Sequence, residues 1–424
     1  MFFFLKRLVK ESWAIFGLFA LIYVLLFTHR VLMDIPAQMY TLRQVCNGEV
    51  AMPPTALFYM LGWLGALGQC QSKIFLGMGA AIACAGLLTA RWWITRYISR
   101  DYLGSYGREA GGMAFTPSGK APFTALNQEM EEENRPASNS INIPFGWISL
   151  TLAFVCSLPT LDWATKGWYI IGQASPNYWM NGTLLASWPF ALVLFWQSYR
   201  QLQRPQADWW RWMLLWLVLL VISKPSYAFV FASVYPLFLV GRHGLGLAVR
   251  WQLMPFAILA LLLVVEFYLI FWQKDSVYVK QFNSGNKSGV EICLLCVWQV
   301  FSTNIPVSIL ASALFPLGVA AVYWQELRQK LLFWYVWAGF MAALVISATF
   351  AQTGEEFSCW NFRWQTYIAS YLLFMVSALL VYEKIRAENF RLNRHSITVI
   401  ALFGLHLISG MVYLVKMWWT QSHY

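Results

Sequence analysis

The sequence predicts an all-α protein, a polytopic transmembrane bundle of about 11–13 helices. Hydrophobic residues make up 59% of the 424 residues and charged residues only 12%, roughly half the charged share of soluble domains. Apolar windows of about 20 residues, the length of a spanning helix, recur from one end to the other. The shorter alternating segments of a membrane β-barrel are absent.

Twelve apolar segments are candidates for these helices. They cover residues 12–28, 54–69, 74–90, 142–160, 183–198, 209–223, 226–241, 252–272, 303–323, 331–350, 366–382 and 396–417. We expect the first to be a retained helix, because no small-residue cleavage site follows its basic flank. The weakest candidate is 54–69, which begins at a proline pair and contains three glycines. We expect it to be re-entrant or interfacial.

Basic residues between the segments predict the orientation, because Lys and Arg are enriched on the cytoplasmic side of membrane proteins. The linker 383–395 carries four of them, and alternating crossings place further basic clusters on the same side, at 200–211, 242–250 and 328–330. The N-terminus and the linker that begins with Arg91, Arg96 and Arg100 are also basic. Three crossings cannot join two cytoplasmic ends, so either 54–69 does not span or a crossing between 54 and 141 is miscounted.

Three parts are expected along the chain. Residues 1–100 hold the N-terminal membrane segments with an outer loop at 29–53, residues 101–141 form a cytoplasmic linker, and residues 142–424 form the main bundle. The linker is predicted from its frequent Gly, Ser, Pro and Asn residues and a short acidic run. Outer loops of the main bundle are expected at 161–182, 273–302 and 350–365.

Several classes of function are disfavoured. The net charge of +11 reflects the basic linkers and does not indicate nucleic-acid binding. There is no phosphate-binding glycine loop, dinucleotide fingerprint, zinc-protease motif or acidic pair for a metal-bound sugar nucleotide. We therefore expect no nucleotide donor, no cofactor and no metal. Cys293 and Cys296 are the one close cysteine pair and predict a helix-face pair or an exterior disulfide rather than a zinc site.

Asp34 is the leading candidate for a catalytic base. It follows the first apolar segment by six residues, in a polar stretch broken by Pro36, and is expected at the outer membrane surface. A carboxylate there can take a proton from a hydroxyl arriving from water while a lipid-borne substrate approaches from the bilayer. Two alternatives are structural: Asp34 caps a juxtamembrane helix, or it pairs with Arg30 or Arg43.

A second candidate region is the loop 161–182, which leads into a helix. Asn181 and Thr183 at the start of that helix predict an N-terminal cap, whose free N–H groups can bind a phosphate or a sugar hydroxyl. Plain capping beside interfacial aromatics such as Trp179 is the alternative. Residues 181–183 also fit a glycosylation sequon.

Further candidates are charged or aromatic groups near the expected outer ends of helices. Lys224 either neutralises a phosphate or reaches to the interface, and Glu266 is either a functional intramembrane acid or solvated. The loop 350–365 combines acidic, aromatic and Arg side chains, which are typical of carbohydrate and phosphate sites. Its candidates are Glu355, Glu356, Trp360, Asn361 and Arg363.

These stretches resemble the outer loops of GT-C-type integral membrane glycosyltransferases of bacterial surface-polysaccharide pathways. The similar parts are Asp34-Ile-Pro-Ala-Gln38 with the following Pro53-Pro54 entry, the block from Pro176 to Thr183, and Trp360-Asn-Phe-Arg-Trp-Gln365. Two positions depart from the pattern, because Gln38 and Met180 stand where these enzymes often have His.

The resemblance implies a GT-C-like fold and an inverting glycosyltransferase. Asp34 would be the base, and the substrate-binding residues would be Arg30, Gln38, Trp179, Asn181, Lys224, Glu266, Glu355, Glu356, Trp360, Asn361 and Arg363. The implied donor is a polyprenyl-phosphate-linked sugar, the acceptor a glycan or lipid-linked glycan, and the location a bacterial inner membrane. Two alternatives are a Wzy-like polysaccharide polymerase or ligase and a transporter or flippase for lipid-linked glycans.

Overall fold

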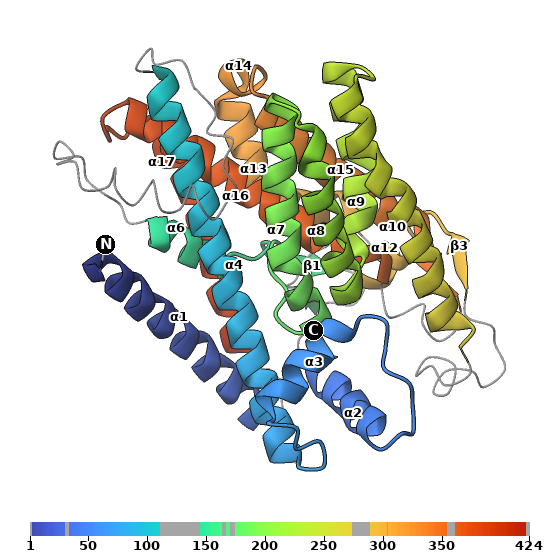
Figure 1. Ribbon diagram of the computed structural model, residues 1–424. Helices are drawn as coiled ribbons and strands as arrows, with labels where there is room; N and C mark the ends of the chain where they lie inside the picture. The colour runs from blue at the N-terminus through green and yellow to red at the C-terminus, as the bar shows by residue number, and fades with distance from the viewer. Residues whose placement is uncertain are drawn as a thin grey trace.

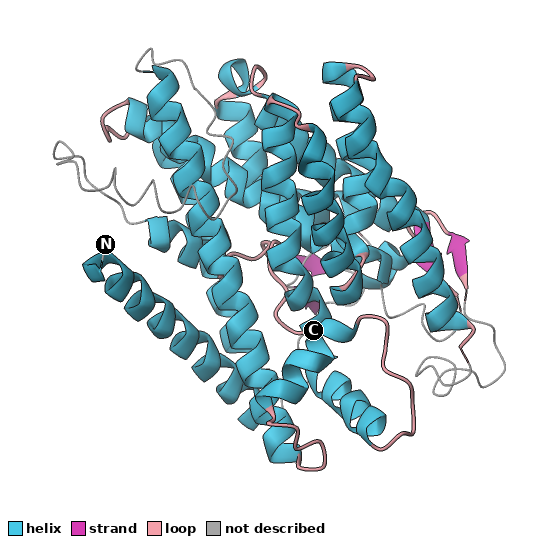
Figure 2. Ribbon diagram, viewed as in Figure 1, coloured by secondary structure: helices cyan, strands magenta, loops and turns pink. Residues whose placement is uncertain are grey.

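The computed structural model describes residues 2–29, 34–110, 145–162, 167–169, 174–273, 289–302, 304–353 and 361–420. It confirms an all-α fold that is 80% helical, with two short antiparallel strand pairs (Figure 2). The pairs join β1 (Thr160–Asp162) to β2 (Gly167–Tyr169) and β3 (Val290–Ile292) to β4 (Phe350–Gln352).

Seven helices of the described residues are long and apolar enough to cross a membrane. They are α1 (Phe2–Thr28), α4 (Lys73–Ala110), α10 (Leu247–Phe271), α13 (Ile305–Val322), α15 (Leu331–Thr349), α16 (Trp364–Ala387) and α17 (Arg394–Thr420). Three further helices belong to the same bundle: α7 (Gly182–Gln203), α8 (Trp210–Ser223) and α9 (Ser226–His243) (Figure 1). The chain is a multi-pass membrane protein, and its outer helices contact lipid.

The centre of the bundle is formed by α16 and α7. Both bury residues on all sides, as expected of a helix enclosed by other helices, and α16 packs against α4, α7, α9, α13, α15 and α17. By contrast, α10 exposes a long row of leucines, valines and aromatics. The bundle therefore has a protein-lined interior and an apolar outer surface.

The segment 54–69 does not span. Its helix, α3 (Ala56–Gly65), has 10 residues and is about 15 Å long, half the thickness of the hydrocarbon core. It packs closely on α4, because a Cβ at Gly79 would lie 2.3 Å from the carbonyl oxygen of Gly62. With α3 excluded, α1 and α4 are the two crossings of the N-terminal part. Two crossings bring the basic N-terminus and the basic end of α4 to the same side.

The predicted helix 142–160 is largely wrong. Only α6 (Phe145–Leu152) is helical. Residues 155–159 lie outside any helix or strand, and residues 155–158 are buried or half-buried. Residues 174–181 are a second buried segment outside any helix. The two segments are joined by Asn177, whose Nδ2 donates to the carbonyls of Leu152 (2.9 Å) and Val155 (2.6 Å). Non-helical backbone is tolerated at membrane depth when protein groups satisfy it in this way.

His406 of α17 fixes the first of these segments. Its Nδ1 donates to the carbonyl of Cys156 (2.7 Å), and its Nε2 accepts the backbone N–H of Phe315 in α13 (3.3 Å). The carbonyl of Ala311, one turn before Phe315 in α13, accepts the N–H of Leu158 at 3.1 Å. Pro316 follows directly and weakens the helix at the same point. The segment is thus bound to α17 through Cys156 and to α13 through Leu158.

The two ends of the bundle differ in charge. We call one the basic end, where α14 (Trp324–Leu327) lies in the upper part of Figure 1. Its ion pairs are Arg96–Glu11, Arg200–Asp101, Lys330–Glu383 and Lys384–Glu326. We call the other the Asp34 end, where α2 (Asp34–Cys46) and α3 lie. There a disulfide joins Cys46 to Cys70, with 6.3 Å between the Cα atoms.

Two expectations about the N-terminal part need correction. Residues 101–110 continue α4 rather than beginning a linker, and the remaining linker residues lie outside the described part of the chain. Arg91 does not belong to a cytoplasmic basic cluster, because its side chain is fully buried halfway along α4.

Candidate functional site

Helix α2 docks on the N-terminus of α7 through two polar side chains. Asp34 and Gln38 are one turn apart and so share a face of the helix. The Nδ2 of Asn181 donates to Oδ2 of Asp34 at 2.9 Å, and the backbone N–H of Gly182 donates to Oε1 of Gln38 at 3.0 Å. Asp34 forms no ion pair with Arg43, although both are described. The structure therefore brings Asp34, Gln38 and Asn181 together.

Asn181 is the predicted cap of α7. Its Oδ1 accepts the backbone N–H of Leu184 (2.9 Å) and the hydroxyl of Thr183 (2.7 Å). Because the oxygen faces these two donors, the amide nitrogen faces Asp34. Asn181 is buried, so this sequon is not presented as a glycosylation site. At Gly182 a Cβ would stand 2.2 Å from the ring of Phe58, so only glycine fits this junction.

Lys224 extends this network into the bundle. It lies at the break between α8 and α9, where Pro225 prevents a continuous helix. Its Nζ donates to Oγ1 of Thr183 at 3.4 Å and lies 4.9 Å from the ring centre of Trp364. Only 9% of Lys224 is exposed, which contradicts the alternative that it reaches to the interface. A continuous chain of contacts leads from Asp34 through Asn181 and Thr183 to Lys224.

Glu266 of α10 lies on the other side of Lys224. It is 5% exposed, so the alternative of a solvated residue is wrong. It lies within electrostatic range of Lys224, but no ion pair joins its carboxyl oxygens to the ammonium group. No group of the described residues binds Oε1 of Glu266.

The start of α16 completes the network with aromatic rings. Nε1 of Trp364 donates to Oδ1 of Asn361 at 3.1 Å, and Asn361 in turn donates to Oε1 of Gln352 at 2.5 Å. The Tyr178 ring centre lies 5.1 Å from those of Trp364 and Tyr367. The guanidinium of Arg363 is fully buried, 5.7 Å from the centre of Tyr367. Asn361 and Arg363 thus belong to the same site as Lys224.

Burial also changes the pKa of Tyr59 in α3. Removal from water raises the pKa of this phenol well above its usual value, and the nearby charge of Asp34 raises it further. Tyr59 therefore stays neutral beside Asp34 at physiological pH.

Not every predicted residue belongs to this site. Trp179 is buried in the core, where its ring packs against Phe19 and Phe154 and its carbonyl accepts the hydroxyl of Tyr23 (2.8 Å). It is a packing residue. Arg30, Glu355, Glu356 and Trp360 lie outside the described residues.

Arg91 was not predicted as an interior residue. Its guanidinium carbon lies 4.2 Å from the ring centre of Trp188 and 4.8 Å from that of Tyr371. Among the described residues, neither Nη1 nor Nη2 finds a hydrogen-bond partner. The sequence held a signal for this position. Arg91 directly follows the apolar segment 74–90, so a helix that continues past this segment can carry Arg91 into the interior of the bundle.

An apolar groove of about 830 Å³ runs beside the polar network. It lies between α9, α10, α15 and the β3–β4 pair. Its lining residues are Phe229, Leu263, Val264, Val265, Phe267, Tyr268, Trp272, Val290, Ile346, Phe350 and Phe362. Phe362 stands between Asn361 and Arg363, so the groove wall adjoins the network directly. No sequence signal predicts the groove, because residues more than 100 positions apart line it.

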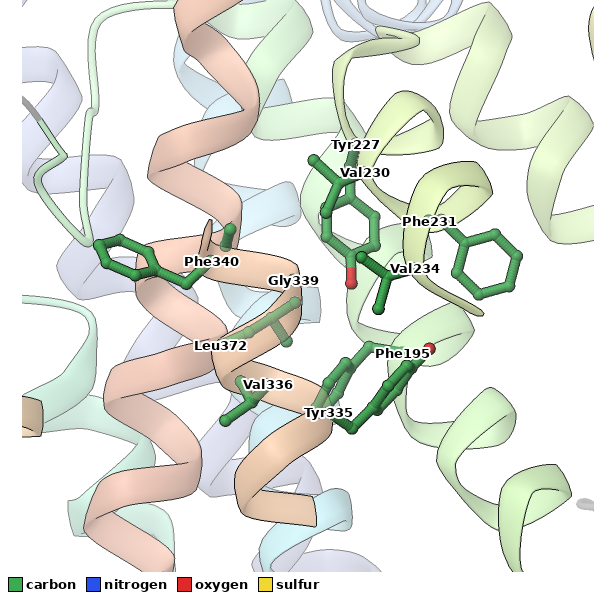
Figure 3. A pocket seen from close by; sticks show the side chains of 11 residues that line it. Phe195, Tyr227, Val230, Phe231, Val234, Tyr335, Val336, Gly339, Phe340 and Leu372 are labelled. Atoms are coloured by element: carbon green, nitrogen blue, oxygen red, sulfur yellow. The ribbon is translucent and has the colours of Figure 1, made fainter. Parts of the chain in front are cut away.

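A second cavity, between α7, α9, α15 and α16, measures only about 10 Å³ (Figure 3). Stacked Phe195 and Tyr335, 5.3 Å apart, form one wall, and the Tyr335 hydroxyl contacts that of Ser198 at 2.7 Å. A space of this size holds about one water molecule. It is a packing gap in the core.

No known protein family, curated protein or solved structure matches this chain. Within the described residues, no group of three or more His, Cys, Asp or Glu side chains is arranged to hold a metal ion. The site must therefore be interpreted from its own chemistry. It combines a half-buried carboxylate, a buried ammonium group, buried aromatics and an adjoining apolar groove. Such a set can remove a proton, stabilise an anion and hold an apolar chain.

Proposed function

We propose that this protein is an inverting, GT-C-like glycosyltransferase that moves a sugar from a polyprenyl-phosphate donor to a glycan or lipid-linked glycan. One observation carries the proposal: the hydrogen-bonded chain that links Asp34 to Lys224 through Asn181 and Thr183. A carboxylate and a buried cation thus belong to one network. Gln38 holds α2 in place through Gly182.

The reaction would proceed by a single displacement. The acceptor hydroxyl gives its proton to Asp34, and its oxygen bonds to the anomeric carbon of the donor sugar. The bond from that carbon to the phosphate oxygen breaks, and its electron pair leaves with the polyprenyl phosphate. Lys224 and Arg363 stabilise the negative charge that develops there. Because attack and departure occur on opposite faces, the configuration inverts.

The groove supports a lipid-borne substrate. Its lining is apolar and lies on the lipid-facing side of α10, whose Val264 and Tyr268 are exposed. An isoprenoid chain can enter sideways from the bilayer while its phosphate approaches Lys224. A water-soluble sugar nucleotide needs no such groove.

The distribution of charge supports catalysis on the non-cytoplasmic side. By the positive-inside rule the basic end faces the cytoplasm, so the Asp34 end faces outward, into the periplasm if the host is a bacterium and the membrane its inner one. The Cys46–Cys70 disulfide lies at this end, which fits an oxidising compartment.

The test is a transfer assay on purified protein with polyprenyl-phosphate hexoses and extracted lipid-linked glycans. Asp34→Asn should lower the rate about 10²–10⁴-fold, the usual contribution of a general base, and leave thermal stability unchanged. Asp101→Asn is the matched control, because Asp101 binds Trp196 (2.8 Å) and Arg200 (3.8 Å) at the basic end. Equal transfer by wild type and Asp34→Asn would remove Asp34 from the mechanism.

The transporter or flippase alternative has one observation in its favour. The non-helical segments 155–158 and 174–181, which are buried or half-buried, resemble the broken helices at transporter binding sites. This alternative predicts movement of a fluorescent lipid-linked glycan across proteoliposome membranes without transfer of its sugar. The polymerase or ligase alternative predicts transfer of whole repeat units from a polyprenyl diphosphate and none from the monophosphate.

A further inference from the structure

We propose that Glu266 recognises the sugar of the lipid-linked donor: its carboxyl group binds sugar hydroxyls between the apolar groove and Lys224. The inference rests on the proposed function, because it concerns the same site. In this proposal Glu266 distinguishes a lipid phosphate that carries a sugar from a lipid phosphate without one.

The first argument is the burial of an unsatisfied group. Glu266 is 5% exposed and its Oε1 has no hydrogen-bond partner among the described residues. Buried polar atoms nearly always have partners, and a buried carboxyl group without one is destabilising. Such a group is expected where a ligand supplies the missing donors.

The second argument is position. Val265 and Phe267, the two neighbours of Glu266, line the groove and are 46% and 38% exposed. Glu266 is buried between them, so its side chain faces the bundle interior, within electrostatic range of Lys224. It therefore lies where an apolar chain in the groove would end and the charged head of a lipid would begin.

The third argument is the kind of group that fits. A carboxyl group repels phosphate but pairs well with hydroxyls, which both donate and accept. Lys224, within electrostatic range, has the opposite preference. The two therefore divide a phosphosugar between them, with the phosphate at Lys224 and the hydroxyls at Glu266. The ring of Trp364, 4.9 Å from the Lys224 ammonium, adds an aromatic surface typical of sugar sites.

A purely structural role fits less well. If Glu266 served only to neutralise Lys224, a direct ion pair would be expected, as Lys330 and Glu383 form at the basic end. Instead Lys224 is held by Thr183 and Trp364, and one oxygen of Glu266 stays without a partner.

The experiment measures binding rather than turnover. Purified wild type, Glu266→Leu and Glu266→Gln are titrated with dodecyl phosphate and with dodecyl-phosphate hexoses, and unfolding temperatures are recorded without ligand. Wild type should bind the best hexose at least tenfold more tightly than dodecyl phosphate. In Glu266→Leu this preference should fall below twofold, with dodecyl phosphate binding and unfolding temperature maintained. Glu266→Gln, which keeps a hydrogen-bonding group, should retain an intermediate preference.

Glu49→Gln is the matched control, because Glu49 is an exposed acid at the same end, held by Asn47; it should behave as wild type. Three results would overturn the proposal: no preference in wild type, an unchanged preference in Glu266→Leu, or loss of both ligands together with a lower unfolding temperature. The proposed function fails separately, if wild type binds the hexose lipids with the expected preference but transfers no sugar.

Discussion

The two ends of the bundle differ in how their described carboxylates meet cations. Arg96 contacts Glu11 at 2.5 Å, and the buried Glu383 binds both Lys330 and the hydroxyl of Tyr102. Asp34 and Glu266, in contrast, form no ion pair with any described residue. The ion pairs described at the basic end neutralise the charges of their members, whereas Oε1 of Glu266 has no hydrogen-bond partner among the described residues. We propose that a substrate supplies that partner.

The largest effect expected from this comparison is on sugar transfer, when one lysine at each end is replaced by methionine. Lys224→Met should reduce sugar transfer about 10²–10³-fold, because an electrostatic group that stabilises developing charge contributes on this scale. Lys330→Met should leave transfer per folded molecule unchanged. Transfer rates normalised to the folded fraction, measured by size-exclusion chromatography in detergent, decide the point. Equal losses of transfer rate in Lys224→Met and Lys330→Met would show that the lysine at the Asp34 end has no special role in transfer.

The next effect tests the junction of α3 and α7. Gly182→Ala should destabilise the protein by about 1–3 kcal/mol, the usual cost of overpacking, because the new Cβ collides with Phe58. Gly77→Ala in α4 is the control: its Cβ would meet nothing within 4 Å, and alanine favours the helix. Thermal unfolding followed by tryptophan fluorescence measures both. A Gly182→Ala protein as stable as wild type would contradict the close approach of α3 and α7.

At the basic end, one substitution should lower the stability of the protein and a second should restore most of it. Lys330→Met leaves the Glu383 carboxylate buried without its cation, which should cost about 1–3 kcal/mol. Adding Glu383→Gln should recover most of this loss, because a neutral amide still accepts the hydroxyl of Tyr102 and no longer needs a cation. Chemical unfolding of the single and double variants gives the coupling. If the double variant is no more stable than Lys330→Met, the loss of stability in Lys330→Met does not come from the unpaired charge of Glu383.

The smallest effect on stability is expected at the half-exposed ion pair of Glu326 and Lys384 at the basic end. Glu326 is half exposed where it pairs with Lys384, so Glu326→Ala should change stability by less than about 1 kcal/mol. That small difference should shrink further in high salt. A loss above 2 kcal/mol would show that this pair is part of the folded core.

The sequence was sufficient for the fold class because spanning helices leave long apolar runs between basic linkers, and both can be recognised locally. It was also sufficient for Asp34, Asn181 and Lys224 as candidates, because polar groups are conspicuous in an apolar chain. It was not sufficient for segment 155–159. That stretch continues an apolar run, and side chains distant in the sequence, among them His406 and Ser409, bind its non-helical backbone. Arg91 was misplaced for a similar reason, since its surroundings are supplied by α7 and α16.

His406 also has a consequence for the order in which the protein can assemble. Its partner Cys156 precedes it by 250 residues, and the ribosome adds about 5–20 residues per second. The segment that holds Cys156 therefore waits on the order of 10–50 s for this hydrogen-bond partner. Its contacts can accordingly be complete only once α17, the last helix of the described residues, is in place.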